Sequence, residues 1–309
     1  MVAVGPGPEE LERLADLSES ISVHAPGVSR LVLIDDANRP EALRQSTHAS
    51  LRERVAWVPT SPVHDPVGWR DRLTTGIWKA FRHLAEAGSW EFVLKVDTDS
   101  LLIAPPEEGI RQRFAQKDRP ALIGAYYTTT TASDDGWKNF EPYVVQLRRW
   151  FARYRDPVTK KTKFYLGCGP RGFRRRAMLK RALRHGYIPS EHCQGGGYAL
   201  AGEALAKAHR VGLWRDEYLW TSTALGEDTA LALSLKSLGL TIGSANRKGE
   251  PFGVIYRGLV ARPEELLKSG FSVIHCLRGD KMHSESELRK IFGLARKEIF
   301  SDKKTTPVR

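Results

Sequence analysis

Cysteine is scarce in this chain, and its scarcity excludes one class of architecture. Only three cysteines occur among the 309 residues: Cys168, Cys193 and Cys276. A small, odd number in a chain of this length argues against a disulfide framework and favours a reducing compartment. Their separations do not match the spacing of a structural zinc site. The fold must therefore rely on a hydrophobic core, and the chain is long enough to bury a sizeable one.

Long apolar runs are missing as well. No segment of about 18 consecutive apolar residues occurs, so the sequence predicts no transmembrane helix. The first residues, MVAVGPGPEELERL, contain neither a basic segment nor a long apolar one, so no secretory signal is predicted. We therefore expect a cytoplasmic protein. Its 41% hydrophobic and 27% charged residues are ordinary for a globular chain.

Acidic residues are outnumbered, 36 against 48 Lys and Arg, which gives a net charge of +12. A basic surface favours anionic partners, although scattered charge that keeps the protein soluble is the alternative. Part of the excess is clustered around Arg171, Arg174 and Arg175 and in residues 296–309. These clusters are candidates for contact with an acidic acceptor or a membrane surface, and a solvated helix face is the alternative. No nucleic-acid-binding signature is present, so no nucleic acid partner is expected.

Strand and helix patterns alternate through the first half of the chain. Residues 8–21 and 69–88 show helical periodicity. Short β-rich runs occupy residues 1–5, 29–36, 54–61, 90–103 and 120–128. This alternation predicts an α/β fold with a mixed, mostly parallel central sheet and helices on both faces.

The second half is less regular. Residues 129–139 read as a surface loop, and 143–154 as a helix or a strand–helix junction. GGGYALAGEALAKAHR (195–210) predicts a turn, a strand and then a helix. Further helices are expected over 226–240 and 284–300, with a strand at 272–279 between them. No linker is long or polar enough to divide the chain, so we expect one continuous domain.

Asp97 and Asp99 follow a strand that reads as core. Residues i and i+2 of an extended chain share a face, so both carboxylates can contact the same ligand. Ligands in open α/β sheets bind beyond the carboxyl ends of the strands, and paired carboxylates suit Mg²⁺ or Mn²⁺. A turn in which the aspartates cap backbone N–H groups is the alternative. Lys95 is expected to point away from the aspartate face.

Asp35 and Asp36 end an earlier strand in the same way. In a parallel sheet their ends would lie near that of the Asp97 strand, where an acidic group can accept from a ribose hydroxyl or a base N–H. The segment DDANRP is also rich in turn residues, and a purely structural turn is the alternative.

Three later segments add candidate site residues. Glycines 195–197 let the backbone approach a ligand closely, or simply form a packing turn. Glu227 and Asp228 stand at a helix start, where acidic residues are stabilising in any case; as a functional group, Asp228 is a candidate general base. His275 ends a β-rich run and is a candidate metal ligand. A satisfied polar histidine is the alternative.

Together these segments resemble the GT-A glycosyltransferases, enzymes that use nucleotide sugars, and are most similar to the β-1,3-galactosyltransferase and fringe type. WEFVLKVDTDSLL resembles the strand leading into the DxD motif of that group. CQGGGYALA resembles its glycine-rich acceptor-side segment, and GEDTAL its Glu-Asp motif, whose aspartate is the base of inverting members. SVIHC supplies a histidine where such enzymes place the last metal ligand. MVAVGPGPEELERLADLSESI and LVLIDDANRP resemble the first βαβ half of GT-A enzymes.

The resemblance implies a GT-A, Rossmann-like fold in which the two halves of the chain have different roles. Residues 1–128 would form the nucleotide-sugar-binding half, ending in the DxD motif, and residues 129–309 the acceptor-binding and catalytic half. The implied reaction is metal-dependent, inverting transfer of a sugar from a nucleotide diphosphate sugar, with a UDP-sugar favoured, to the hydroxyl of a carbohydrate or another acceptor. The implied site residues are Asp97, Asp99 and His275 for Mn²⁺ or Mg²⁺; Asp35, Asp36 and Asp97 for the nucleotide; Gly195, Gly196, Gly197 and Glu227 for the acceptor; and Asp228 as the catalytic base.

Two other functions remain open at this stage. A metal-dependent nucleotidyltransferase could use the same strand-end carboxylates, but it would want a basic, glycine-rich loop after the first strand. GPGPEEL has the glycines without Lys or Arg. A non-catalytic basic module that binds anionic polysaccharide or nucleic acid would bind in a salt-sensitive way, without any dependence on Asp228.

Overall fold

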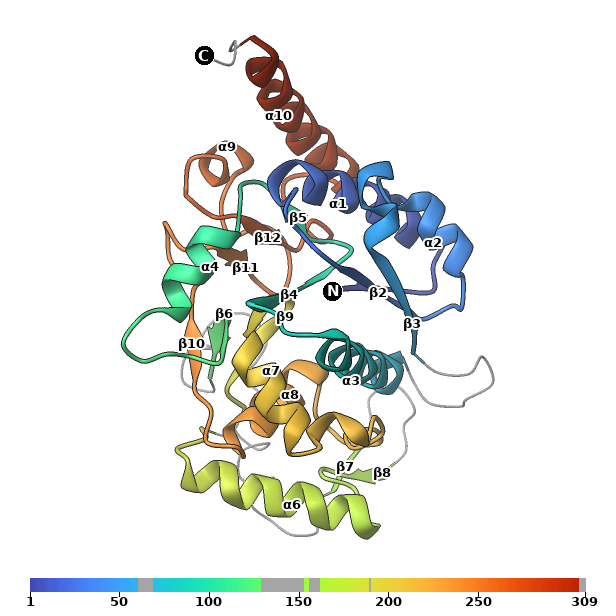
Figure 1. Ribbon diagram of the computed structural model, residues 1–309, viewed down its shortest axis with the longest axis vertical. Helices are drawn as coiled ribbons and strands as arrows, with labels where there is room; N and C mark the ends of the chain where they lie inside the picture. Colours follow the sequence, from blue (N-terminus) through green and yellow to red (C-terminus); the bar gives the residue numbers. More distant parts are fainter. Residues whose placement is uncertain (61–68, 129–152, 156–161, 189, 306–309) are drawn as a thin grey trace.

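A seven-stranded mixed sheet forms the centre of the molecule (Figure 1). The computed structural model describes residues 1–60, 69–128, 153–155, 162–188 and 190–305. The strand order is β10-β6-β9-β4-β1-β2-β3. The strands are β1 (Val2–Val4), β2 (Leu31–Asp35), β3 (Val55–Pro59), β4 (Phe92–Asp97), β6 (Leu122–Tyr127), β9 (His192–Ala201) and β10 (Ile242–Ser244). The predicted α/β fold class is confirmed.

The sheet changes direction at β9. Strands β3, β2, β1 and β4 are parallel, whereas β9 pairs antiparallel with both β4 and β6. The sequence-based turn at Gly195–Gly197 is wrong, because these glycines lie inside β9, which is buried along nearly its whole length. A strand that is buried on both faces leaves little room for side chains beside the neighbouring groups, and glycine needs the least room.

Helices cover both faces of the sheet. Those on one face are α3 (Trp69–Ala87), α7 (Gly202–Arg210) and α8 (Glu227–Lys236), with α6 (Gly169–Arg184) packed outside α8. Those on the other face are α1 (Glu9–His24), α2 (Pro40–Ser46) and α4 (Glu107–Phe114). The remaining helices are α9 (Pro263–Leu266), α10 (Glu285–Thr305) and the 3₁₀ segments η1 (Ala49–Arg54) and η3 (Leu213–Arg215). No helix of the described residues has both the length and the apolar character needed to cross a bilayer.

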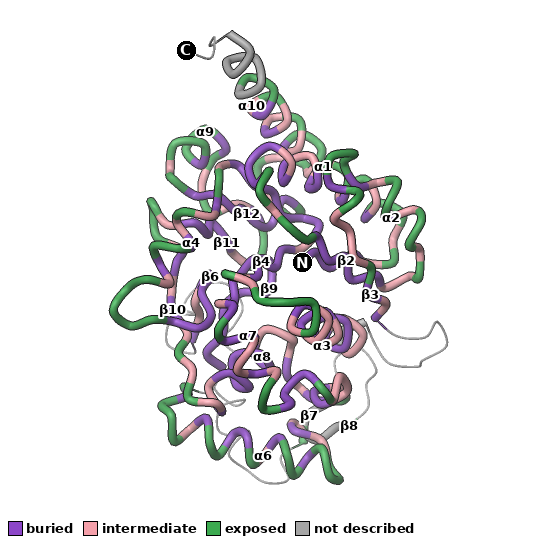
Figure 2. The backbone as a smooth tube through the Cα atoms, in the orientation of Figure 1, coloured by how far each residue is buried: buried purple, intermediate pink, exposed green. Residues whose placement is uncertain are grey.

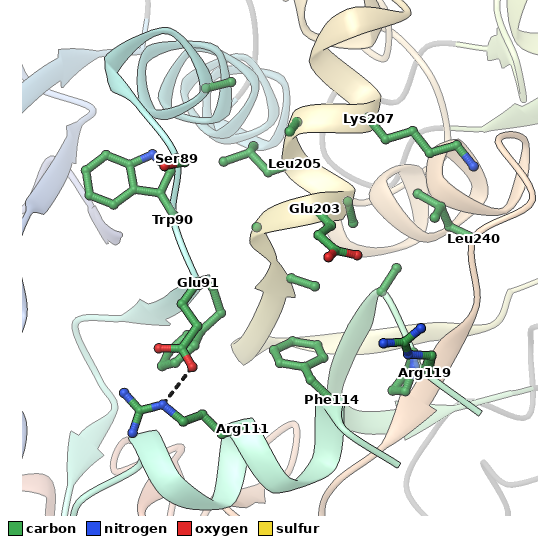
Figure 3. Close-up of a pocket in the computed structure, with 18 of the residues that line it drawn as sticks. Ser89, Trp90, Glu91, Arg111, Phe114, Arg119, Glu203, Leu205, Lys207 and Leu240 are labelled. Atoms are coloured by element: carbon green, nitrogen blue, oxygen red, sulfur yellow. Dashed lines mark hydrogen bonds and ion pairs between the residues drawn. The ribbon is translucent and has the colours of Figure 1, made fainter. Parts of the chain in front are cut away.

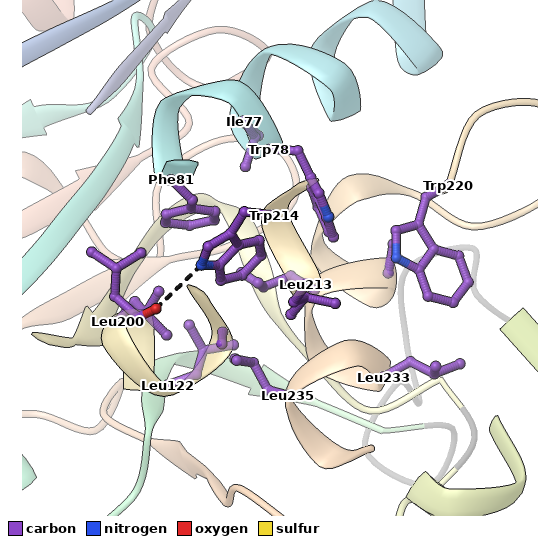
Figure 4. Packing of buried hydrophobic residues seen from close by; sticks show 14 of the residues in the cluster. Ile77, Trp78, Phe81, Leu122, Leu200, Leu213, Trp214, Trp220, Leu233 and Leu235 are labelled. Atoms are coloured by element: carbon purple, nitrogen blue, oxygen red, sulfur yellow. Dashed lines mark hydrogen bonds between the residues drawn. The ribbon is translucent and has the colours of Figure 1, made fainter. Parts of the chain in front are cut away.

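The largest core lies between the sheet and the α3–α7–α8 layer (Figures 2 and 4). Trp214 sits at its centre, with its ring centroid 5.6 Å from that of Trp78 and 4.9 Å from that of Phe81. Its indole nitrogen donates to the Leu205 carbonyl at 3.2 Å. Buried aromatic surface of this size is a major source of stability, and it fixes α7 and α8 against the sheet.

A second sheet of three strands lies beside the first. It consists of β11 (Phe252–Val254), β12 (Val273–His275) and β5 (Leu101–Leu102), which directly follows β4. A separate ribbon pairs β7 (Arg153–Arg155) with β8 (Thr162–Phe164). The loop expected at 129–139 and most of the segment 143–154 lie outside the described residues. All three cysteines are free thiols, which confirms the absence of a disulfide framework.

Candidate active site

The Asp99 carboxylate lies at the centre of a buried cluster just beyond β4. Its Oδ1 lies 3.3 Å from His275 Nε2, and its Oδ2 accepts a 2.6 Å hydrogen bond from Arg278 Nε. The Cys276 thiol also donates to Oδ2, at 3.2 Å. The potential ligand atoms of Asp99, His275 and Cys276 all lie within 4.8 Å of one another. These oxygen, nitrogen and sulfur atoms therefore form a candidate cation site.

Strand pairing explains why residues so far apart in the chain meet here. A turn closes after β4, with Ser100 N donating to the Asp97 carbonyl at 3.1 Å, and the chain enters β5 at once. Strand β12 pairs antiparallel with β5, placing Ile274 opposite Leu101. His275 therefore follows beside the turn that carries Asp99.

His275 is held in one orientation by hydrogen bonds at both ring nitrogens. Its Nδ1 donates to the Ile255 carbonyl at 2.8 Å, so Nε2 faces Asp99. Burial lowers the pKa of His275, but the hydrogen bond and charge of Asp99 outweigh burial and raise that pKa to about 10. Burial alone would raise the pKa of Asp99, yet His275 and Arg278 hold it well below its usual range. Asp99 is thus ionised and paired with the positive groups of His275 and Arg278, and a divalent ion bound here would take the place of the His275 proton, because a ligating imidazole is neutral.

Lys95 is fully buried and faces the same side of β4 as Asp97. Its Nζ donates to Asp97 Oδ1 at 2.6 Å and to the Gly195 carbonyl, and it lies 4.0 Å from Glu227 Oε1. The expectation that Lys95 points away from the aspartates is wrong for Asp97, because residues i and i+2 of a strand share a face. Strand β4 ends at Asp97. The same rule therefore does not reach Asp99, whose carboxylate contacts residues at the end of β12.

The glycines of β9 make room for the site residues. A Cβ atom at Gly195 would overlap Glu227 Oε1, and one at Gly196 would overlap the His275 imidazole. The Gly196 carbonyl accepts a 2.7 Å hydrogen bond from Ser100 Oγ. The absence of side chains at 195 and 196 therefore lets the turn after β4, the start of α8 and the end of β12 come close together along one strand.

Thr98, between the two aspartates, is also held in place. Its hydroxyl donates to Glu10 of α1, and its carbonyl accepts from Arg289 of α10 at 3.1 Å. Glu10 is in turn paired with Arg13 at 2.5 Å. These contacts fix the backbone that presents Asp97 and Asp99.

Glu227 begins α8 and is largely buried. Burial raises its pKa to about 7, the charges of Asp228 and Asp97 act in the same direction, and Lys95 opposes them. Near neutral pH this carboxyl group therefore exchanges readily between its acid and its carboxylate form.

Replacing Glu227 by glutamine is expected to stabilise the protein selectively at alkaline pH. The pKa of Glu227 rises from 4.5 to about 7 on folding, so the stability of the protonated form is fully present below pH 4.5 and is lost as the pH rises through 7. Urea unfolding at pH 5 and pH 8 should show the difference between variant and wild type changing by about 2–3 kcal/mol. Glu203→Gln, at an exposed position of α7, is the control. A difference of equal size at both pH values would contradict the expectation.

One carboxylate oxygen of Asp228 accepts hydrogen bonds at the start of α8, and the other faces His192. Its Oδ1 accepts from Thr229 N at 2.7 Å and from Thr229 Oγ1 at 3.3 Å. Its Oδ2 lies 3.7 Å from Nε2 of the buried His192. The side chain is 16% exposed, so the carboxylate is not sealed in the core.

Asp35 and Asp97 lie at the same edge of the sheet, as expected. Asp35 pairs in register with Val4, and Asp97 with Ala3. The Asp35 carboxylate, however, accepts from Ala37 N at 2.9 Å, from Arg39 N, and from Trp57 Nε1 at 3.2 Å. These bonds favour the structural-turn interpretation.

The neighbouring Asp36 is also paired. It accepts from Arg72 Nε at 2.6 Å and from Thr60 Oγ1 at 2.9 Å. A nucleotide contact by Asp35 or Asp36 would have to be made alongside these bonds.

Two of the α6 arginines singled out from the sequence have partners within the protein. Arg175 is buried and donates to the carbonyls of Leu166 and Thr221, each at 2.9 Å. Arg171 pairs with Asp216 at 3.1 Å. Arg175 therefore ties α6 to neighbouring loops, and neither the predicted anionic contact nor a solvated face describes it.

A groove of about 990 Å³ opens at the other end of the sheet (Figure 3). It lies between α4 and α7, and Trp90, Phe114 and Leu205 are among the residues that line it. Phe92 lies at its edge, at the beginning of β4, about 16 Å along that strand from Asp97. The groove is thus separate from the acidic cluster.

Five of the predicted acidic and histidine residues fall into two neighbouring groups, to which Asp35 and Asp36 do not belong. Asp99 and His275 form one, joined by Cys276 and Arg278. Asp97, Glu227 and Asp228 form the other, gathered around Lys95 and the Gly195 carbonyl. Sequence reasoning missed Lys95, His192, Cys276 and Arg278, although each lies within three residues of a motif position.

No protein-family model and no curated protein sequence matches the chain. Solved structures of similar architecture include the galactosyltransferase LgtC in complex with donor and acceptor sugar analogues, with 11% identity over 95% of this chain and 96% of that chain, at a TM-score of 0.45. Another is the bifunctional glycosyltransferase WbbM, with 12% identity over 97% of this chain and 51% of that chain, at 0.48. A third is core-mannan synthase A from Aspergillus fumigatus in a Mn/GDP form, with 12% identity over 79% and 71% of the two chains, at 0.35.

Proposed function

We propose that this chain is a metal-dependent, inverting glycosyltransferase. It would move a sugar from a nucleotide diphosphate sugar, with a UDP-sugar favoured, to a hydroxyl group of a carbohydrate or another acceptor. The observation that carries the proposal is the convergence of two acidic groups on β9. The Asp99–His275 pair lies on one side of Gly196, and Lys95 with Asp97 and Glu227 lies around Gly195.

The residues around Asp99 fit a divalent cation. His275 Nε2 and Asp99 Oδ1 are held 3.3 Å apart, a separation suited to two ligands of one ion. Such an ion, Mn²⁺ or Mg²⁺, would neutralise the charge that develops on the diphosphate leaving group. Asp97 is the further oxygen ligand proposed from the DxD motif. Arg278, at the mouth of the cluster, would add positive charge next to the diphosphate.

Asp228 is the proposed general base. The acceptor oxygen attacks the anomeric carbon, the bond from that carbon to the diphosphate oxygen breaks, and the acceptor proton passes to Asp228 Oδ2. The nucleoside diphosphate leaves from the opposite face, which inverts the configuration. Glu227 and Gly195–Gly197 are the proposed acceptor contacts, and Asp35 and Asp36 the proposed nucleotide contacts.

The competing functions receive less support. A nucleotidyltransferase would want cationic groups in the loop after β1, yet residues 5–8 contain no Lys or Arg and lead into Glu9 and Glu10 at the start of α1. A purely anion-binding module gives no reason to bury Lys95 and Asp99 beside further ionisable groups, because burying charge is costly.

A thermal-shift panel tests the proposal. The protein is heated with UDP-, GDP-, ADP- and CMP-linked sugars, each with Mn²⁺ or with EDTA. We expect a UDP-sugar with Mn²⁺ to raise the melting temperature, since a ligand at about 100 times its Kd adds about 2.7 kcal/mol of stability. The anomeric configuration of any transfer product is then read by NMR. Stabilisation by every nucleotide regardless of metal, or by none, would contradict the proposal.

A further inference from the structure

Lys95 has no assigned part in the scheme above, although it lies in the middle of the candidate site. It is fully buried in β4, and its ammonium is the cation within 4.0 Å of both Asp97 and Glu227. The Tyr198 ring lies under the ammonium, 5.6 Å from Nζ to the centroid. A lysine is rarely buried unless it is paired, so these contacts determine where the ammonium sits.

The contacts of Lys95 connect three elements that carry different proposed roles. The hydrogen bond to Asp97 reaches the donor side at the end of β4. The bond to the Gly195 carbonyl fixes the central strand β9. The approach to Glu227 reaches the start of α8, where Asp228 is the next residue. One side chain therefore sets the spacing between the donor side and the proposed base.

We propose that Lys95 is a positioning residue for sugar transfer, which holds the Asp97 carboxylate and the Glu227–Asp228 helix start at a fixed distance. This role rests on the proposed function. Lys95 itself would touch neither the donor nor the acceptor, because it is enclosed by Asp97, Gly195 and Tyr198.

The expected kinetic signature follows from which contacts Lys95 makes. The Asp99 cluster, which would bind the diphosphate, is held by His275, Cys276 and Arg278. Loss of Lys95 leaves this cluster and the carboxylate of Asp97 in place, so it should affect donor binding much less than the rate of transfer. The acceptor, the base and the donor should be less precisely aligned, and a misplacement of about 1 Å can lower the rate about 10²-fold.

The test compares the full-length variants Lys95→Met, Lys95→Gln, Asp97→Asn and the double variant Lys95→Met/Asp97→Asn. We expect Lys95→Met to lower kcat about 100-fold with the donor KM within about threefold of wild type. Lys95→Gln keeps an N–H donor without the charge and should recover part of kcat, and it carries the test if Lys95→Met does not fold. Lys207→Met is the matched control, because Lys207 donates to the Leu238 carbonyl at 3.1 Å beside the remote groove.

The outcomes separate the inference from the function on which it rests. In the double variant, a kcat no more than about threefold below that of the worse single variant supports action through Asp97. If the losses in kcat of the two single variants multiply in the double variant, Lys95 does not act through Asp97. A donor KM that rises by the same factor as kcat falls leads to the same conclusion. Folded Lys95 variants with wild-type kcat overturn the positioning role alone. A wild-type protein that turns over no nucleotide sugar overturns the proposed function instead.

Discussion

Asp228→Asn is expected to lower the rate of sugar transfer by about 10³-fold while the affinity for the donor stays within about threefold of wild type. Removing a general base typically costs 10²–10⁴-fold. Asparagine keeps an oxygen to accept from Thr229 N, as Asp228 Oδ1 does at 2.7 Å, so the start of α8 should be preserved. What the variant loses is the ability to accept the acceptor proton. Steady-state kinetics gives the rate, and calorimetry with UDP and Mn²⁺ gives the donor affinity.

Asp216→Asn is the control for this experiment. Asp216 pairs with Arg171 at the outer helix α6, away from β9, and its loss should leave both quantities near wild type. If donor affinity and transfer rate fall by equal factors in Asp228→Asn, the residue contributes to binding and not to proton transfer. If transfer persists at the wild-type rate, another group is the base.

Asp99→Asn is expected to abolish metal-stimulated transfer, with a loss of 10³-fold or more. The substitution removes the negative charge that faces His275 at 3.3 Å and Arg278 at 2.6 Å. Without that charge, burial favours the neutral form of His275, and Arg278 remains as an uncompensated positive group, so the position no longer attracts a cation. A divalent ion that neutralises a leaving group supplies several kcal/mol to the transition state, which sets the scale of the loss.

Metal binding should be measured directly in this variant. Electron paramagnetic resonance counts free Mn²⁺ in titrations of wild type and Asp99→Asn, independently of activity. Because breaking a buried ion pair can cost about 3–5 kcal/mol, the fold of the variant is verified by circular dichroism. Asp118→Asn is the matched control, since Asp118 also pairs with an arginine, Arg113, at 2.8 Å but is 55% exposed. An unchanged Mn²⁺ affinity in Asp99→Asn would show that the metal does not bind at this position.

The two groups of acidic residues meet opposite electrostatic conditions. Positive neighbours outweigh burial at Asp99 and hold its pKa down, whereas burial and like charge raise the pKa of Glu227 to about 7. Carboxyl groups whose pKa values are pushed apart in this way are typical of sites that divide charge stabilisation from proton handling. This division agrees with a cation at Asp99 and acid–base chemistry at the start of α8.

Much of the sheet could be predicted because it depends on local pattern. The β-rich run before Asp97, the helical period of residues 69–88 and the acidic pair at the start of α8 are each visible within one segment. Strand-end carboxylates were expected at one edge because parallel strands share that edge, and the registers of Asp35 and Asp97 confirm it. The error at Gly195–Gly197 arose because glycine in a short window indicates a turn, whereas here the close approach of neighbouring groups requires it inside a strand.

Short-range periodicity and composition are sufficient to predict the alternation of strands and helices, the free thiols and most of the acidic residues of the candidate site. The partners of those residues depend on the three-dimensional packing. Long-range strand pairing brought His275 to Asp99, and burial placed Lys95 between Asp97 and Glu227. The physical reason is that a side chain's charge and pKa depend on what is packed around it in space, and residues many positions apart supply that packing.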